Sequence, residues 1–336
     1  MMGFMASDTM QAWVLDRYGS PDDLVLREVP RPPPGAGEIM VRVVAASVND
    51  WDWCIVRGVP AYVRAFTGWR RPRVAVLGVD AAGVVEAVGA DVNSIEPGDR
   101  VHGDLSASGF GAFGEFVCGP KSVWRRMPDG MGFEEAAALP HAGGLAWQGL
   151  EQLGGLTPED SLLVNGAGGG VGMLAAHIAR SFGVRSLTGV DALSKHEAMR
   201  AAGYETVIDY RSDDFTRTGV RYTCVLDTRS DRPLTSYARA LEPEGRYVTV
   251  GGTTGALLRV GLLGPAFGRL LRKRYHLLSL KPNEGLVEVN TMWKARLLAP
   301  SVDRVSPYAD LPTAIARFGR GEHIGKIVVR VGSGPR

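Results

Sequence analysis

Residues 162–173 read Leu162-Leu-Val-Asn-Gly-Ala-Gly-Gly-Gly-Val-Gly-Met173, an apolar run followed by a cluster of glycines. A run rich in Ala, Ile and Leu continues to 182, so the stretch predicts a buried strand, a tight turn and a helix. A dinucleotide-binding fingerprint needs a tight turn, close backbone approach to a pyrophosphate and close helix–strand packing. Ala167, Gly169 and Gly172 occupy these three positions, with Ala in place of the first glycine.

The turn is therefore expected to hold the phosphates of a dinucleotide. Unpaired N–H groups at the start of a helix favour an anion there. We predict cofactor contacts from the turn and the first helical residues, which are Ala167, Gly168, Gly169, Gly170, Val171 and Gly172. A glycine run by itself also fits a flexible turn, but this run has the strand and the helix that the fingerprint requires.

Strand-like and helix-like segments alternate around this turn. Further strands are expected near 184–190, 207–209, 224–226, 247–250 and 276–280, with a helix at 195–202. Alternation of this kind predicts βαβ units and a parallel sheet. The expected fold class is α/β, with a Rossmann doubly wound parallel sheet over residues 129–283.

Residues 10–128 have a different pattern. Short strand-like runs alternate with Pro- and Gly-rich stretches such as 31–35, which predicts a β-rich, barrel-like or sandwich-like domain. From 284 onward an amphipathic helix, a strand and a second helix lead to a last strand at 326–331. We expect that strand to return to the first domain, so that 284–336 completes 10–128. Residues 1–9 read as a disordered extension or as one whose start site is ambiguous.

The adenosine end of the site leaves the cofactor open. Asp191 stands where the second strand should end, and an acidic residue there binds the ribose hydroxyls of NAD. Lys195 and Tyr210 place a cation and a phenol where they could hold the 2′-phosphate of NADP. Lys195 also fits a solvated helix face, so the residues alone permit either dinucleotide.

Composition excludes several classes of protein. The 336 residues carry 38 Lys+Arg and 36 Asp+Glu, and this near balance argues against a strongly basic nucleic-acid binder. Three scattered cysteines, Cys54, Cys118 and Cys224, are too few for a disulfide framework or a four-cysteine zinc lobe, which indicates a reducing, cytoplasmic location. No secretory signal is recognisable, and the longest uncharged stretch, 161–179, is broken by glycines, so we expect no membrane span.

The motifs of the chain, taken in order, resemble those of the medium-chain dehydrogenase/reductase superfamily, in its zinc-independent, quinone-oxidoreductase-like branch. They lie at 48–58, 78–85, 97–101, 166–172, 207–210 and 325–328. The resemblance extends from Gln11 to Val331. It implies a GroES-like catalytic domain beside the Rossmann domain, and hydride transfer from NAD(P)H to an electron-poor C=C bond (an enone) or a quinone.

The resemblance also bears on metal and cofactor. Zinc-dependent members place a Cys where this chain has Asn49 and a His-Glu pair where it has Val79-Asp80, so we expect no metal. Lys195 and Tyr210 match the positions that contact the 2′-phosphate in NADPH-dependent quinone reductases. Asp191 departs from that pattern; NADPH is therefore favoured and NADH remains possible.

The glycine pair Gly251 and Gly252, after the fifth predicted strand, is expected to let the backbone approach the nicotinamide, with a plain turn as the alternative. For the whole protein we expect a small-molecule substrate, a homodimer, and neither a nucleic-acid nor a membrane partner.

Candidate catalytic residues lie on either side of the domain change. Asn49 occupies the position that faces nicotinamide and substrate in the family, which implies a hydrogen-bond donor, although a turn-forming asparagine is the alternative. His141 stands on the segment that enters the cofactor domain, and we predict a site role; a satisfied interdomain histidine is the alternative. Trp51 and Trp53 are expected to wall the substrate pocket, although large aromatics also belong to cores.

Two other functions remain open, and three departures from the family pattern, at Cys54, Leu145 and Arg229, support the second of them. One is a carbonyl reductase or tailoring enzyme of specialised metabolism on the same fold. The other is a non-enzymatic dinucleotide-binding redox sensor. Residues 255–280 mix apolar residues with Arg and Lys, which fits a membrane-surface element or, alternatively, a helix over the substrate cleft or an oligomer contact.

Overall fold

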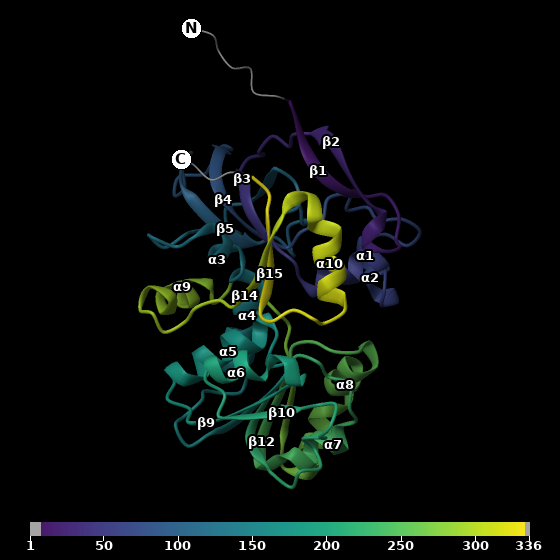
Figure 1. Cartoon of the computed structure of the whole chain (residues 1–336), viewed down its shortest axis with the longest axis vertical. Helices are drawn as coiled ribbons and strands as arrows, with labels where there is room; N and C mark the ends of the chain where they lie inside the picture. Colours follow the sequence, from purple (N-terminus) through teal and green to yellow (C-terminus); the bar gives the residue numbers. More distant parts are fainter. Residues whose placement is uncertain (1–7, 333–336) are drawn as a thin grey trace. The chain divides into compact units, whose positions relative to one another are not determined.

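The computed structural model describes residues 8–332, and the chain divides into two compact units (Figure 1). One unit runs to His141 and resumes at Val302, and the other is Ala142–Ser301. These limits lie later in the chain than the expected boundaries at 128/129 and 283/284. Helix α3 (Phe133–Ala137) packs on strands of the first unit, and Val289 lies beside Gly143 within the second, which accounts for both differences.

The second unit is built on a six-stranded parallel sheet. Its strands are β8 (Ser161–Asn165), β9 (Ser186–Asp191), β10 (Thr206–Asp209), β11 (Tyr222–Asp227), β12 (Leu241–Thr249) and β13 (Arg274–Leu277). The spatial order is β10-β9-β8-β11-β12-β13, so the direction of winding reverses between β8 and β11. This is the doubly wound order, and ligands of such sheets bind outside the carboxyl ends of the strands at the reversal. The expected Rossmann sheet is confirmed.

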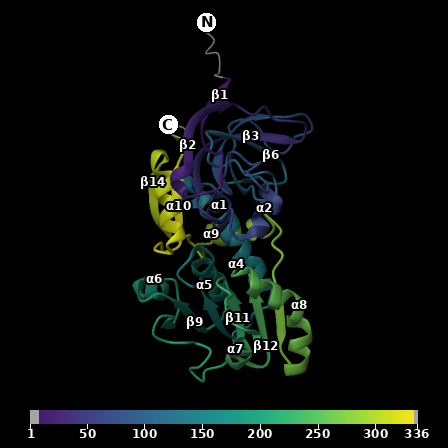
Figure 2. The same cartoon turned by 90° about the vertical axis from the view of Figure 1, so that its right-hand side faces the viewer.

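Four helices connect strands of this sheet: α5 (Gly170–Ser181), α6 (His196–Ala201), α7 (Leu234–Ala240) and α8 (Thr254–Leu271). Helix α4 (Pro140–Gln152) precedes β8, and α9 (Leu286–Lys294) follows β13. Helix α5 buries Met173, Leu174 and Ile178, as expected from its apolar spacing. Helix α8 packs chiefly on the edge strand β13, and Figure 2 shows it on the outer side of β12.

The first unit is β-rich. Strands β1 (Thr9–Leu15) and β2 (Leu24–Pro30) form an antiparallel hairpin. A seven-stranded sheet has the order β14-β15-β3-β4-β5-β7, with β6 also paired to β3. Its strands are β3 (Glu38–Ser47), β4 (Asp80–Val88), β5 (Arg100–Asp104), β6 (Phe116–Pro120), β7 (Arg125–Arg126), β14 (Val302–Pro307) and β15 (Lys326–Arg330). The C-terminal strand β15 pairs with β3, so the last strand does return to the first unit.

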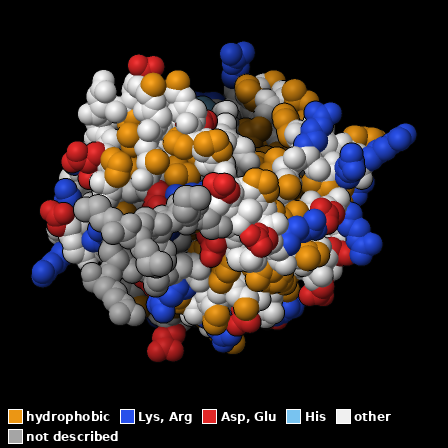
Figure 3. Space-filling view, turned by 90° about the horizontal axis from the view of Figure 1, so that it is seen from above, with side chains coloured by type: hydrophobic (Ala, Val, Ile, Leu, Met, Phe, Trp, Pro, Cys, Tyr) orange, Lys and Arg blue, Asp and Glu red, His pale blue; other side chains and the backbone are white. Residues whose placement is uncertain are grey.

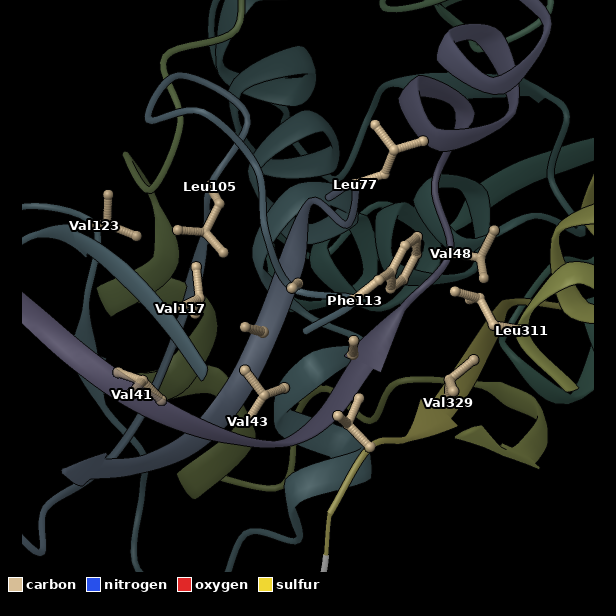
Figure 4. Close-up of a cluster of buried hydrophobic side chains, with 14 of the residues drawn as sticks. Val41, Val43, Val48, Leu77, Leu105, Phe113, Val117, Val123, Leu311 and Val329 are labelled. Carbon is tan, nitrogen blue, oxygen red and sulfur yellow. The ribbon is translucent and has the colours of Figure 1, made fainter. Parts of the chain in front are cut away.

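Three further helices, α1 (Asp50–Arg57), α2 (Ala61–Thr67) and α10 (Leu311–Gly319), belong to the same unit. Its core joins β3, β6, β15 and α10, and Figure 4 shows Phe113 amid the labelled valines and leucines of that cluster. Because these side chains come from both ends of the chain, the core forms only when residues after Val302 join the first unit.

The surface agrees with the balanced composition. The face in Figure 3 carries Lys, Arg, Asp and Glu side chains interspersed with apolar ones. Among residues 8–332, no helix is both long and apolar enough to cross a membrane.

Candidate functional site

The glycine turn joins β8 to α5 at the reversal of the sheet. Gly166 has φ +82°, and the N–H groups of Gly166 and Ala167 donate to the Val190 carbonyl at 2.9 and 3.1 Å. A Cβ on Gly172 would lie 2.5 Å from the Ala167 Cα, so only glycine permits this approach of helix to turn. The close helix–strand packing that the fingerprint demands is therefore present.

The start of α5 offers unpaired donors. The first intrahelical hydrogen bond runs from the Met173 N–H to the Gly169 carbonyl at 3.0 Å. The N–H groups of Gly170, Val171 and Gly172 precede it and belong to the first turn, whose donors have no partner inside a helix. This geometry fits a dinucleotide pyrophosphate.

Asp191 closes over the turn from the end of β9. Its Oδ2 accepts the Gly168 N–H at 2.9 Å and its Oδ1 accepts the Ala192 N–H at 2.8 Å. The Lys195 Nζ lies 3.3 Å from Oδ1, and both side chains are almost buried. A Cβ on Gly168 would meet the Lys195 Cδ at 2.5 Å, so the absence of a side chain there admits the Asp191–Lys195 pair.

Tyr210 stands beside this pair in the sheet register. It directly follows Asp209, which pairs with Asp191 in the β9–β10 ladder. Its side chain is exposed, and the Arg211 guanidinium lies 5.6 Å from the centre of its ring. The three residues predicted for the adenosine end of the cofactor therefore lie at the ends of neighbouring strands.

The predicted pair Gly251 and Gly252 follows β12 and meets the loop after β11. The Ser230 N–H donates to the Gly251 carbonyl at 3.0 Å. A Cβ on Gly252 would lie 2.2 Å from the Ser230 carbonyl oxygen, so glycine is required for the two loops to approach. Asp227, at the end of β11, accepts hydrogen bonds from Asn165 and Tyr247 and joins the carboxyl ends of three strands. Sequence reasoning did not single out Asp227 as a support of the turn.

A buried polar network occupies the first unit, and Asp80 is its centre. The Asp80 Oδ2 accepts from the Ser47 hydroxyl at 2.9 Å, from the Asn49 Nδ2 at 3.0 Å and from the Lys326 Nζ at 3.2 Å. Its Oδ1 accepts the backbone N–H of His141 at 2.9 Å. The two residues predicted to be catalytic, Asn49 and His141, therefore share one carboxylate.

The Asn49 side chain is fully engaged within the unit. Its Nδ2 donates to the Ser47 carbonyl at 3.1 Å as well as to Asp80, and its Oδ1 accepts from the Lys326 Nζ at 2.5 Å. Donation to a substrate or a carboxamide would require one of the Nδ2 hydrogen bonds to break. The geometry therefore favours a positioning role for Asn49 over direct contact.

His141 forms a buried pair with Asp104. Its Nδ1 lies 2.8 Å from the Asp104 Oδ2, and the other Asp104 oxygen accepts the Ser106 N–H at 2.7 Å. Burial lowers the pKa of His141, but the carboxylates of Asp104 and Asp80 outweigh burial and the repulsion from Lys326, so the pKa is raised above its usual value. When the ring is protonated, the Nδ1–H donates to the Asp104 carboxylate, and the Nε2–H of the imidazolium is the one that can be given up.

The remaining residues of the α1 region make contacts within the first unit. Asp52 accepts the Asn49 and Gly78 N–H groups, and burial raises its pKa to about 7. Burial raises the pKa of the Cys54 thiol to about 12, which leaves it protonated and weakly nucleophilic at neutral pH. Trp51 lies against the core with Phe110 6.5 Å away, and Trp53 packs against Gly319 and beneath the Arg57 guanidinium.

Lys326, Asp80 and Asp104 are functional candidates that sequence reasoning did not select. Lys326 stands in the closing Gly325-Lys-Ile-Val328 motif and Asp80 in the Gly78-Val-Asp80 motif. Both motifs supported the family resemblance, but neither residue was assigned a role of its own. A lysine directly before the apolar run 327–329 was the clue to a buried partner.

The donor set does not fit a zinc ion. Among residues 8–332, no group of three or more His, Cys, Asp or Glu side chains could hold a metal. Around Asp80 the neighbours are an amide, a hydroxyl and the ammonium of Lys326, whereas zinc takes thiolates, imidazoles and carboxylates. We therefore derive no step through a metal.

Comparisons with known proteins agree with this architecture. The alcohol dehydrogenase GroES-like domain model matches residues 35–129, and the zinc-binding dehydrogenase model matches 202–329. A mycocerosic acid synthase-like polyketide synthase of Mycobacterium tuberculosis is 31% identical over 90% of this chain, and the chain spans only 14% of that protein.

Two other matches cover most of both chains. The 2-methylene-furan-3-one reductase of Solanum lycopersicum is 28% identical over 95% of this chain and 79% of its own length. The solved structure of the quinone oxidoreductase from Coxiella burnetii superposes with a TM-score of 0.86 at 26% identity, covering 96% of this chain and 100% of that one.

We expect Lys326→Met to destabilise the first unit by about 3–5 kcal/mol, because it leaves the Asp80 carboxylate buried without its cation. Urea unfolding measures the change. The double variant Asp80→Asn/Lys326→Met removes both charges and should regain most of the loss. As a control, Arg330→Met breaks the exposed pair with Glu134 and should cost less than about 1 kcal/mol. Equal losses for Lys326→Met and the control would contradict the assignment.

Proposed function

This chain belongs to the medium-chain dehydrogenase/reductase superfamily and is quinone-oxidoreductase-like, and from that premise we propose that it reduces an electron-poor C=C bond or a quinone with NAD(P)H. The observation that carries the proposal is the buried His141–Asp104 pair. Reduction of this kind needs a hydride and a proton, and an imidazolium held by a carboxylate can supply that proton.

The second unit would hold the cofactor. The glycine turn and the first turn of α5 would hold the pyrophosphate, while Asp191, Lys195 and Tyr210 would receive the adenosine ribose. Gly251 and Gly252 allow close backbone approach to the nicotinamide. When bound, NAD(P)H supplies the hydride that adds to the electrophilic carbon of the substrate.

The first unit supplies the proton. Addition of hydride to an enone places an electron pair on the carbonyl oxygen and the adjacent carbon, which together form an enolate. The His141 Nε2–H bond breaks as the new C–H or O–H bond forms. The imidazole becomes neutral and keeps the proton on Nδ1, which still donates to Asp104. Asp80 holds the His141 backbone N–H and, with Asn49 and Lys326, positions the ring. We retain Trp51, beside Phe110, as a wall of the substrate pocket and treat Trp53 as packing.

We further propose that no zinc takes part, because the amide of Asn49 and the ammonium of Lys326 replace the ligands that zinc requires. A cytoplasmic location is consistent with the three cysteines, which are all free thiols. A homodimer is consistent with the open edge of β13, whose main-chain groups a second copy could pair with.

Turnover on a substrate panel tests the function. Enones and quinones should oxidise NADPH at rates well above those of simple aldehydes, and activity should persist in chelator-treated protein without bound metal. A preference for aldehydes or ketones would instead identify a carbonyl reductase. Cofactor binding without any turnover would identify a non-enzymatic dinucleotide-binding protein.

We expect His141→Gln to lower kcat by about 10²–10⁴-fold, the usual contribution of a positioned acid. Wild-type activity should fall as the pH rises through the raised pKa of His141, because the imidazolium is lost there. The variant should lack that limb, and Asp104→Asn should shift it to lower pH because a counter-charge is removed. The control His276→Gln changes a histidine on β13 and should leave the profile unchanged.

Retained NADPH binding would show that the His141→Gln variant is folded. A pH profile that is identical in wild type and variant would exclude His141 as the proton donor.

The cofactor preference is proposed to be NADPH. The 2′-phosphate would take a charge-assisted hydrogen bond from Lys195 and a neutral one from Tyr210, in competition with the Asp191 carboxylate that already pairs with Lys195. Because Asp191 also accepts the Gly168 N–H, its carboxylate is held toward the turn and is partly neutralised.

We expect NADPH to bind about tenfold tighter than NADH. Lys195→Ala should erase this preference and Asp191→Gly should enlarge it; Asp191→Asn separates the loss of charge from the loss of the acceptor for Gly168. Fluorescence titration of both cofactors measures the ratio, with Lys294→Ala on α9 as the matched control. Tighter binding of NADH to the wild type would show that Asp191 receives the ribose hydroxyls.

A further inference from the structure

Helix α8 buries its small side chains and exposes its large ones. Ala256, Val260, Gly264 and Gly268 face the unit, and a Cβ on Gly264 would lie only 2.9 Å from the Tyr275 Cβ. The leucines lie on the other side, where Leu262 is 75% and Leu270 78% exposed, with Leu258 and Leu263 beside them. An amphipathic helix of a globular unit ordinarily buries its leucines, so this face requires a partner.

The charged residues of this surface are all basic. Residues 254–274 contain Arg259, Arg269, Arg272, Lys273 and Arg274 and no Asp or Glu, in a chain whose net charge is only +2. Arg272 pairs with Glu244, and Lys273 donates to main-chain carbonyls. Within the described part of the chain, Arg259, Arg269 and Arg274 have no carboxylate at salt-bridge distance.

A second surface of the same character lies on the first unit, around α2. Phe66 is 75% and Trp69 68% exposed, and Tyr62 is exposed beside them. Arg70, Arg71 and Arg73 follow directly, and no Asp or Glu occurs between residues 53 and 79. Each unit therefore presents exposed apolar side chains among cations that have no acidic neighbours in sequence.

We propose that each of these two surfaces, α8 with 272–274 on one unit and α2 with 68–73 on the other, binds anionic lipid. Leucines and aromatic rings would enter the headgroup boundary, while arginine stems lie along it with their guanidinium groups toward the phosphates. A second copy is a poorer occupant of the exposed faces of α8 and α2 than of the β13 edge, because a two-fold contact through either helix face would bring like charges together. The proposal departs from the expectation of no membrane partner and selects one of the alternatives left open for 255–280.

Lipid binding is independent of the proposed reduction, and cosedimentation of the full chain with vesicles tests it. Vesicles containing phosphatidylglycerol should bind the protein, and binding should weaken as salt is raised. Phosphatidylcholine vesicles should bind at least about tenfold less, since about 1 kcal/mol of attraction per cation is lost. Arg259→Gln and Arg269→Gln should each weaken binding by about fivefold.

The apolar part of each surface is tested separately. Leu262→Glu/Leu270→Glu and Phe66→Asp/Trp69→Asp should each lower partitioning at least about tenfold, because apolar burial is lost and negative charge is added. Val287→Glu and Val220→Glu change apolar residues elsewhere that are also more than half exposed, and they should leave binding unchanged. Retained NADPH binding shows that the variants are folded, whether or not the protein turns over a quinone.

Absence of binding to anionic vesicles would overturn the proposal, as would binding that none of the variants weakens. A dimer that Leu262→Glu/Leu270→Glu converts to monomer would also overturn it, because the α8 surface would then be occupied by a second copy.

Discussion

The first unit depends on the buried carboxylate of Asp80. A carboxylate without solvent costs several kcal/mol, and here four donors from β3, the start of α1, β15 and the start of α4 offset that cost. Through these hydrogen bonds Asp80 holds the C-terminal strand in place beside β3 and the His141 backbone against β4. It also leaves the His141 ring free to pair with Asp104, so the same charge that joins the strands also positions the proposed proton donor.

In the second unit, the turn after β8 depends on two glycines that let other groups approach its backbone. The turn after β8 can approach α5 because Gly172 has no side chain, and the Asp191–Lys195 pair can close over the turn because Gly168 has none. Asp227 joins the ends of β8, β11 and β12 beneath it, and burial raises the pKa of its carboxyl. The cofactor region is thus shaped by backbone proximity, while its charges are already paired within the unit.

Prediction from sequence succeeded where the decisive contacts are local. The strand–turn–helix pattern at 162–182 and the spacing from the turn to Asp191 follow from neighbouring residues, and both the parallel sheet and the return of the last strand were found as expected. Lys326 and Asp80 are 246 residues apart, so no local pattern indicates that they meet. The resemblance predicted that Asn49 faces a substrate. Nothing in its own segment of sequence shows that Lys326 and Asp80 already hydrogen-bond its side-chain amide.

Helix α8 shows a different limit of sequence patterns. Periodicity identifies a helix with an apolar face, but it assumes that this face is the buried one. In α8 the glycines at 264 and 268 let the backbone pack directly on Tyr275 and Lys273, and this close approach turns the leucines outward. Substituting larger residues at those glycines would force the helix away from β13, so the packing of small residues decides which face is exposed. The orientation of the leucines is therefore a property of the tertiary contact and could not be inferred from their spacing.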